Sequence, residues 1–519
     1  MNRLLRSSAV ISAMTMISRI LGLVRDMVLF HLFPVGGATD AFLAANRIPN
    51  LLRRLVAEGA FSLAFVPVLS EYKETKSKEA LQDLIDYVTG RLMLILFLIT
   101  IVGVIAAPIV MQIFAPGFST KEGARPELAA DLLRITFPYI FFISLSAMAG
   151  GILNTWNKFA VPAFTPVLLN IVMILAMVWW APYFDEPVTA IAWAVFIGGI
   201  AQLAFQIPSL IRLGVLPRPR FKRAHEGVSK ILKLMLPALF GSSVAQVNLL
   251  LNTIIASMIS VGSISWLYSS DRFVELPLAL FGVALGVVIL PKLSKDHAKS
   301  DGDNFKQTLN WAIRVALVIS LPATIGLMLL AKPILGTVVY NISAWTDIQM
   351  AGMSLITYAI GLPAFVLVKV LAPGFYSRQD TKTPVKVGIV AVFANMLLSL
   401  LIVYPWYQSG AVGAHAGLAL AVALAGYVNA ISLMVILIRQ DILHFSKDWV
   451  GFLARIFVAI AMMGAVLYFL NPVDEWWRET KIWGRLGTLF GLIILAAISY
   501  LGSLMLLGIN LKKLIKGTH

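Results

Sequence analysis

Long apolar segments recur along the whole chain, and they constrain its fold more than any other feature. A stretch of roughly 20 apolar residues can cross the hydrocarbon core of a bilayer as a helix. Fourteen such stretches cover residues 7–32, 39–70, 88–114, 130–153, 161–181, 188–212, 229–259, 265–292, 307–330, 349–373, 384–404, 412–438, 450–470 and 485–508. The alternating segments of about ten residues that β-barrel strands show are missing. The sequence therefore predicts an all-α polytopic membrane protein with 14 transmembrane helices.

The composition excludes several other classes of protein. Of the 519 residues, 59% are hydrophobic and 13% are charged, whereas soluble domains carry roughly 25% charged residues. A soluble enzyme, a disordered chain and a fibrous repeat are therefore excluded. The chain has no cysteine, which excludes disulfides, thiolate catalysis and cysteine-based zinc sites. Its six histidines are scattered without the spacing of metal ligands, so we expect neither a metal site nor a cofactor.

The basic residues alternate with the apolar segments. Connections that follow odd-numbered segments are poor in Lys and Arg, and those that follow even-numbered segments are basic, as at 73–78, 218–223, 292–299, 378–382 and 512–516. The positive-inside rule then places both termini in the cytoplasm. It also explains the net charge of +16 by contact with anionic lipid, so nucleic acid is not expected as a partner.

Two pairs of short motifs repeat at nearly the same offset. The segment around Pro67 resembles that around Pro291 at an offset of 224, and connection 156–162 resembles 378–384 at an offset near 222. Six segments separate the members of each pair, which therefore keep the same membrane orientation. This predicts two pseudo-symmetric six-helix lobes, 1–222 and 223–440, followed by two extra helices in 441–519. Chance matches of proline at helix ends are the alternative.

Ionisable residues lie deep inside three of the predicted spans. Each would cost about 2.5–3.5 kcal/mol at a lipid-facing helix centre, so these side chains must face a hydrated cavity or one another. The span 7–32 carries Arg19, Arg25 and Asp26; the span 39–70 carries Asp40, Arg47, Arg53, Arg54 and Glu58; and the span 265–292 carries Asp271, Arg272 and Glu275.

Helical spacing sorts these charges into faces. Ser18 and Arg25 share one stripe, and the neighbouring stripe holds Arg19 and Asp26. The spacings of Arg54 with Glu58 and of Arg272 with Glu275 allow ion pairs. One interpretation is a cavity that binds an anion, because arginine is in excess and its planar fork of donors suits phosphate and pyrophosphate. The other is an internal salt-bridge network that holds the two halves together.

The last two spans, 450–470 and 485–508, carry few deep charges. They are interpreted either as lipid-facing helices or as a groove for a long apolar tail. Trp476, Trp477 and Trp483 between them are predicted to be interfacial anchors. The triplet Asp301-Gly-Asp303 is like the motif of sugar transferases, but it lies in a short cytosolic connection and is interpreted as a solvated turn.

Several motifs resemble those of the MurJ (MviN) family of lipid II flippases, which act in bacterial peptidoglycan synthesis. The resemblance runs the full length of the chain. It is carried by Ser18-Arg19-Ile-Leu-Gly22-Leu-Val-Arg25-Asp26, Ala38-Thr39-Asp40-Ala41-Phe42, Pro49-Asn50-Leu-Leu-Arg53-Arg54, Ala57-Glu58-Gly59-Ala60-Phe61, Leu153-Asn154-Thr155-Trp156-Asn157 and Leu371-Ala-Pro373-Gly374-Phe375-Tyr376-Ser377-Arg378-Gln379-Asp380.

The resemblance implies fourteen helices, a cationic central cavity, alternating access and a tail groove along the last two helices. It implies lipid II, the undecaprenyl-pyrophosphate-linked disaccharide-pentapeptide, as the substrate, and the bacterial inner membrane as the location. Membrane lipids are expected partners, and the cell-wall synthesis machinery is a further candidate. The functional arginines of the family fall on Arg19, Arg25, Arg53, Arg54 and Arg272, with Asp26, Asp40, Glu58 and Glu275 as acidic partners and Ser18 as a supporting residue.

The sequence thus favours a lipid transporter and not an enzyme. In this hypothesis Arg25, Arg53 and Arg272 bind the pyrophosphate. Arg19 and Arg54 either add to the positive electrostatic field of the cavity or stabilise the salt-bridge network through Asp26 and Glu58. The alternatives are a flippase for another polyprenyl-linked saccharide, a multidrug or cation antiporter, and a membrane glycosyltransferase.

The energy source is left open between an ion, the membrane potential and downstream consumption of the product, because no P-loop for ATP is present. Some relatives have a sodium site built with acidic residues in the seventh and eleventh helices. Those spans here offer Asn248, Asn252 and Asn395 but no carboxylate, so such a site is not expected.

Overall fold

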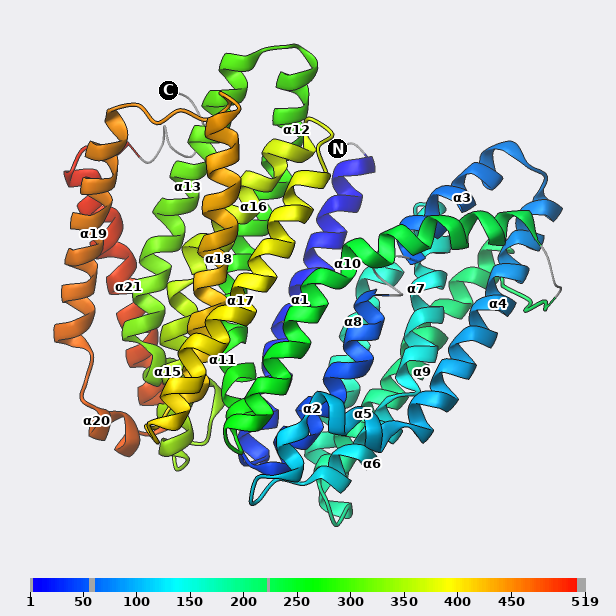
Figure 1. Cartoon of the computed structure of the whole chain (residues 1–519), viewed down its shortest axis with the longest axis horizontal. Coiled ribbons are helices and arrows are strands. Elements are labelled where there is room, and N and C mark those ends of the chain that lie inside the picture. The colour runs from blue at the N-terminus through cyan, green and yellow to red at the C-terminus, as the bar shows by residue number, and fades with distance from the viewer. Residues whose placement is uncertain (1–2, 56–60, 222–224, 511–519) are drawn as a thin grey trace. The chain divides into compact units, whose positions relative to one another are not determined.

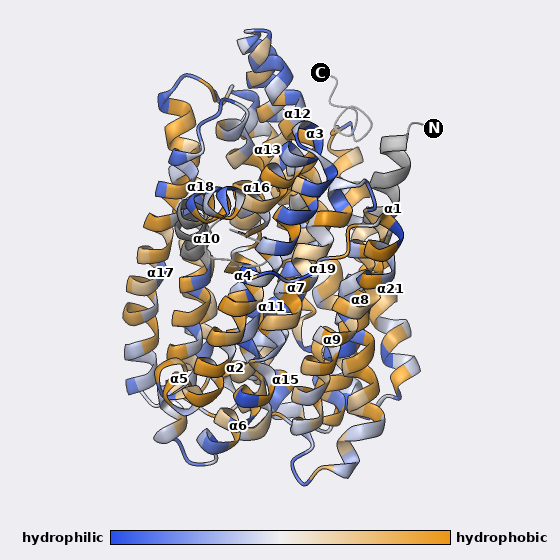
Figure 2. Ribbon diagram, turned by 90° about the vertical axis from the view of Figure 1, so that its right-hand side faces the viewer, coloured by the Kyte–Doolittle hydropathy of each residue, from blue (hydrophilic) through white to orange (hydrophobic). Residues whose placement is uncertain are grey.

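Helices account for the regular structure of the protein. The computed structural model describes residues 3–55, 61–221 and 225–510, and no strand occurs in these ranges. The chain divides into two compact units, Met1–Ser265 and Trp266–His519. Figure 2 shows apolar residues along the middle of the helices and polar residues gathered at their ends. The prediction of an all-α polytopic membrane protein is confirmed.

The first unit contains ten α-helices within its described residues. They are α1 (Arg3–Leu32), α2 (Gly37–Leu52), α3 (Ser62–Thr75), α4 (Lys78–Ile105), α5 (Ala107–Phe114), α6 (Pro126–Thr136), α7 (Tyr139–Thr155), α8 (Ala160–Leu175), α9 (Val188–Leu213) and α10 (Glu226–Ile259). Short turns of 3-10 or π helix are η2 (Pro116–Ser119), η3 (Ala176–Trp180) and η4 (Ala181–Tyr183). Helix α1 packs on α8, α2 on α6, and α7 on α9, while the long α10 packs against α3 (Figure 1).

The second unit begins within α11 (Ser263–Pro277). Its other α-helices are α12 (Ala284–Ala298), α13 (Gly302–Leu329), α14 (Ala331–Ile334), α15 (Trp345–Ile360), α16 (Leu362–Tyr376), α17 (Lys382–Gln408), α18 (Ala414–Arg439), α19 (Asp448–Leu470), α20 (Asp474–Glu479) and α21 (Ile482–Leu506). The π-helical turns η5 (Leu278–Val283) and η6 (Leu335–Val339) interrupt them. Helix α17 packs on α18, and α19 packs on both α13 and α21 (Figure 1).

Eleven helical segments in the described residues are long and apolar enough to span a membrane. They correspond to predicted spans from 88–114 onward, except 229–259. The described residues of the three remaining predictions form helices too: α1 in 7–32, α2 and α3 in 39–70, and α10 in 229–259. The count of 14 is thus consistent with the structure, although length and apolarity alone identify eleven.

The repeated connections fold into the same local structure. The turn after α7 holds Asn157 at φ 58°, and the turn after α16 holds Gln379 at φ 61°. In the first, the Lys158 N–H donates to the Leu153 carbonyl at 2.8 Å, and in the second the Asp380 N–H donates to the Phe375 carbonyl at 3.1 Å. These pairs lie 222 residues apart, as the sequence repeat predicts. The division into lobes 1–222 and 223–440 stays a prediction.

One of the three predicted interfacial tryptophans is not an anchor. Trp477 is 2% exposed, and its indole N–H donates to the Asn471 side chain at 3.1 Å and the Pro472 carbonyl at 3.2 Å. Trp483, in contrast, is 81% exposed. The prediction was wrong for Trp477 because the short helix α20 turns this side chain inward, where its N–H finds two acceptors.

Candidate functional site

Arg25 is fixed between its own helix and a distant one. Its Nε and Nη2 donate to one carboxylate oxygen of Asp26 at 2.9 and 2.6 Å, and its Nη1 donates to the Asn170 side chain on α8 at 3.1 Å. The Asn170 amide donates in turn to the Ser18 carbonyl at 3.1 Å. The side chains of Arg25 and Asp26 are only 14% and 7% exposed. All three guanidinium nitrogens of Arg25 are therefore engaged.

This arrangement differs from the predicted network in two respects. Asp26 forms an ion pair with Arg25, although helical spacing places Asp26 on the same stripe as Arg19. Arg19 is exposed, and no ion pair joins it to another described residue. Ser18 contributes its carbonyl group to the network through Asn170.

Asp40 holds the segment that leads into α11. This carboxylate in the first turn of α2 is 1% exposed. It accepts hydrogen bonds from the backbone of Gly262 at 2.6 Å and from the backbone and hydroxyl of Ser265 at 2.9 and 2.5 Å. Gly262 has a φ of 95°, which an L side chain rarely adopts. A positive φ and a buried carboxylate thus fix this connection, which we call the 262–265 turn.

The other charged residues of α2 and its C-terminal end have less uniform surroundings. The Arg47 guanidinium donates to the Thr253 hydroxyl on α10. Arg53 is half-buried and donates from Nε to the Asn50 side chain at 3.4 Å. Arg54 is exposed. Glu58, predicted to pair with Arg54, lies outside the described residues.

In the second unit, Arg272 is bound within α11 itself. Its Nη1 lies 3.1 Å from the Glu275 carboxylate, which confirms the pairing that the spacing predicts. The Arg272 Nη2 donates to the Tyr268 hydroxyl at 2.8 Å, and the Arg272 Cζ lies 4.8 Å from the centre of the Tyr268 ring. The Arg272 and Glu275 side chains are 35% and 47% exposed.

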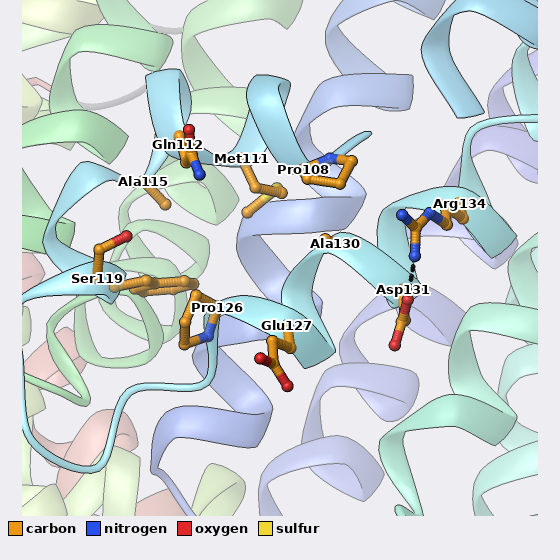
Figure 3. A pocket seen from close by; sticks show the side chains of 11 residues that line it. Pro108, Met111, Gln112, Ala115, Ser119, Pro126, Glu127, Ala130, Asp131 and Arg134 are labelled. Carbon is orange, nitrogen blue, oxygen red and sulfur yellow. Dashed lines mark hydrogen bonds and ion pairs between the residues drawn. The ribbon is translucent and has the colours of Figure 1, made fainter. Parts of the chain in front are cut away.

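A separate cavity of about 450 Å³ opens between α5, η2 and α6. Apolar groups such as Met111 and Phe118 form part of its wall. Asp131 and Arg134, paired at 2.6 Å, lie at another part (Figure 3). None of the predicted site residues lines this cavity, so the cavity and the arginine clusters are different features of the first unit.

Other candidate chemistries find little support in the described residues. No group of three or more His, Cys, Asp or Glu that could hold a metal ion occurs there. Asp301, from the triplet that resembles sugar transferases, caps α13 and accepts a hydrogen bond from the Asn304 backbone at 3.1 Å. Hydrogen bonds from the Asn304 side chain and backbone lower the pKa of Asp301. Asp301 thus has a structural role as a helix cap.

Sequence reasoning missed the uncharged partners of the site. Asn170, Thr253 and Ser265 each bind a predicted site residue from another part of the chain. Their sequence signal is a polar residue inside an apolar span, which for Asn170 is conspicuous in 161–181. The pattern does not indicate which helix such a residue faces.

Comparison with known proteins identifies the family. The family model described as "Lipid II flippase MurJ" matches residues 29–483. The chain belongs to the MurJ family of lipid II flippases. A protein of Vibrio cholerae named "Probable lipid II flippase MurJ" is 45% identical over 100% of this chain and 98% of its own length. The "Lipid II flippase MurJ" of Burkholderia cenocepacia is 38% identical over 97% of this chain and 98% of its own length.

Solved structures give the same result. A structure titled "Lipid II flippase MurJ, inward closed conformation" has a TM-score of 0.78 and 27% identity, and covers 96% of this chain and 98% of the other. An inward-facing multidrug transporter of the MATE family and MOP superfamily has a TM-score of 0.66 at 15% identity, over 83% of this chain and 98% of its own, so it shares the fold. As a MurJ family member, the protein is a lipid flippase and not an enzyme, which confirms that prediction.

Proposed function

We propose that this protein carries lipid II from the cytoplasmic to the outer leaflet of the bacterial inner membrane by alternating access through a cationic cavity. The observation that carries the proposal is the presence of arginines inside the predicted spans 7–32, 39–70 and 265–292 in a chain of the MurJ family. Lipid II bears a pyrophosphate, and arginine binds such groups through paired hydrogen bonds. No covalent step on the substrate and no cofactor is part of the proposal.

The arginines differ in how they would meet the substrate. Arg19 and Arg54 are exposed, so they would meet the pyrophosphate first. Arg25 and Arg272 are held by Asp26 and Glu275, and the pyrophosphate would displace these carboxylates. Such an exchange keeps each guanidinium paired with an anion throughout.

Asp40 would act as a latch in the transport cycle. Its three hydrogen bonds hold the 262–265 turn to α2. Both segments are predicted to face outward here, because the basic connections lie at the opposite ends of their spans. Release of a head group to the outside would require this latch to open. A substituted Asp40 is therefore expected to change the balance between conformations and not the affinity for pyrophosphate.

The apolar tail of the substrate would stay in lipid beside α19 and α21. These two helices pack along each other and expose large apolar side chains, among them Phe457, Phe469 and Ile498. A polyprenyl chain could lie on such a surface without entering water, while the head group crosses through the cavity.

A leaflet-exposure experiment tests this function. In cells depleted of the protein, an extracellular toxin that cleaves lipid II reports how much lipid II reaches the outer leaflet. Re-expressed wild type should restore cleavage, and Arg25→Ala should not. Arg134→Ala, at an exposed ion pair outside the arginine clusters, is the matched control and should restore cleavage. If lipid II stays accessible after depletion in a strain without another flippase, the proposal of lipid II as substrate fails, and other polyprenyl-linked saccharides are tested next.

A further inference from the structure

Three polar residues at four-residue spacing form one stripe on α13. Lys306, Asn310 and Arg314 all face the segment that ends α18 and begins α19. The Lys306 ammonium lies 3.3 Å from the Asp441 carboxylate. The Asn310 side chain accepts a hydrogen bond from the Trp449 indole N–H at 3.2 Å. The Arg314 Cζ lies 5.0 Å from the ring centres of both Trp449 and Phe452.

Arg314 differs from Arg25 and Arg272 in its partners. Arg25 and Arg272 each have a carboxylate partner, whereas no described carboxylate lies within ion-pair distance of Arg314, and its buried Nε has no hydrogen-bond partner there. A cation–π contact stabilises the positive charge through the ring face. It leaves the Nη–H donors of the guanidinium available to an anion, whereas the Nε–H is buried.

The surrounding aromatic residues hold this guanidinium in place. Trp449 packs edge-on against Phe445 at 4.9 Å and against Phe452 at 5.7 Å between ring centres. Trp449 is 6% exposed and Phe452 is 9% exposed, and the bond to Asn310 fixes the indole. A charged group held in one geometry loses little entropy when a ligand binds. The guanidinium is thus already positioned for a partner.

The Arg314 side chain is predicted to reach the level of the lipid head groups. It lies eight residues after the exposed pair of Lys306 and Asp441, or about 12 Å along the helix. It also contacts Trp449, in the first turn of α19, where tryptophan marks the membrane interface. The head-group layer spans roughly 5–8 Å in each leaflet, and an arginine side chain can extend toward it. The basic connections predict that this end faces the cytoplasm.

We propose that Arg314, with Trp449 and Phe452 behind it, binds the phosphate of an anionic glycerophospholipid in the cytoplasmic leaflet. The phosphate would accept hydrogen bonds from the guanidinium and neutralise its charge. A phospholipid with a single net negative charge fits better than a zwitterionic one, whose ammonium would bring a second positive charge. Arg314 is not one of the proposed pyrophosphate ligands, so the phosphate bound here is assigned to a bulk phospholipid, although the tail of the transported lipid is also proposed to lie beside α19.

Native mass spectrometry of the full-length protein tests this site. Phosphatidylglycerol and phosphatidylcholine of matched chains are titrated onto wild type, Arg314→Gln and the control Lys306→Gln. Wild type should retain phosphatidylglycerol preferentially. Arg314→Gln should weaken its tightest binding about tenfold, since a hydrogen-bonded charge pair is lost, and Lys306→Gln should change it less than twofold. Equal losses in the two variants would show a general charge effect and overturn the proposal, as would unchanged binding in Arg314→Gln.

Two further arms separate the remaining explanations. Undecaprenyl pyrophosphate is added as a competitor: the proposal expects phosphatidylglycerol to stay bound at Arg314, and displacement that depends on Arg314 would assign the site to the transported lipid. Arg314→Lys keeps the charge but loses the planar fork, so it should lose about threefold in affinity even if Arg314→Gln does not fold. The proposal would be contradicted if Arg314→Lys bound phosphatidylglycerol as tightly as wild type does. It would also be contradicted if wild type showed no preference for phosphatidylglycerol over phosphatidylcholine.

Discussion

Arg25 in the first unit and Arg272 in the second unit carry the same charge but are held in different ways. Arg25 uses three hydrogen bonds, one of them to Asn170, which is 145 residues away. Arg272 is bound by two residues of its own helix, Tyr268 and Glu275. The Asp26 partner is nearly buried and the Glu275 partner is half-exposed. A residue from a distant helix therefore helps to hold the first arginine, whereas helical spacing accounts for the ion pair of the second.

Replacing each arginine by lysine should reveal the largest difference. Lysine keeps the charge but cannot reproduce a planar fork with three partners. Arg25→Lys is expected to lower lipid II exposure more than tenfold, whereas Arg272→Lys should retain activity within about threefold. The toxin cleavage assay in depleted cells measures both. Equal losses would mean that the two arginines contact the substrate in the same way and that their different surroundings do not matter for transport.

Removing the two carboxylates compares the stability of the ion pairs. Asp26→Asn leaves a charge uncompensated in a nearly buried site, and we expect a loss of about 3 kcal/mol. Glu275→Gln breaks a pair that water reaches, and the loss should stay below about 1 kcal/mol. Unfolding of the purified variants in detergent, followed by tryptophan fluorescence, gives these values. A Glu275→Gln variant that is the less stable of the two would reverse the comparison.

The uncharged partners should have smaller effects. Asn170→Leu removes both the acceptor for Arg25 and the donor to Ser18, and we expect a loss of about 2 kcal/mol. Tyr268→Phe keeps the ring under Arg272 and removes only the hydroxyl, so about 1 kcal/mol should be lost. The same unfolding measurement applies. If Tyr268→Phe matches Asn170→Leu, the link between α1 and α8 contributes no more than a bond within one helix.

The smallest effect is expected at Gly22, which lies beside Asn170. A Cβ built there would be 3.8 Å from the Asn170 amide nitrogen, an ordinary contact distance. Gly22→Ala should therefore keep the network and change stability by less than about 1 kcal/mol, with a gain favoured by helix propensity. Gly117→Ala is the contrasting control, because its Cβ would lie 2.0 Å from the Ser257 carbonyl oxygen. Destabilisation at Gly22 would show that α1 and α8 approach more closely than the structure indicates.

Local rules predicted much of the structure. Apolar length predicted the helical membrane fold, and a spacing of three residues predicted the pair of Arg272 and Glu275. The repeat offset of 222 matched two turns that each have a left-handed residue at the equivalent position, Asn157 and Gln379. Each of these features depends on residues close in sequence or on a length compared with the bilayer, so no knowledge of packing was needed.

The sequence by itself determined the fold class and the family, and it predicted which charged residues lie deep in the spans. Only the tertiary structure decided which groups hold those charges: Asn170 for Arg25, Thr253 for Arg47, and the 262–265 turn for Asp40. These partners come from segments far apart in the chain. Helical periodicity indicates which face of a helix is polar, but the packing of the whole unit decides which other helix lies against that face. A hydrogen bond needs its two atoms within about 3 Å, so its partner can be named only once that packing is known.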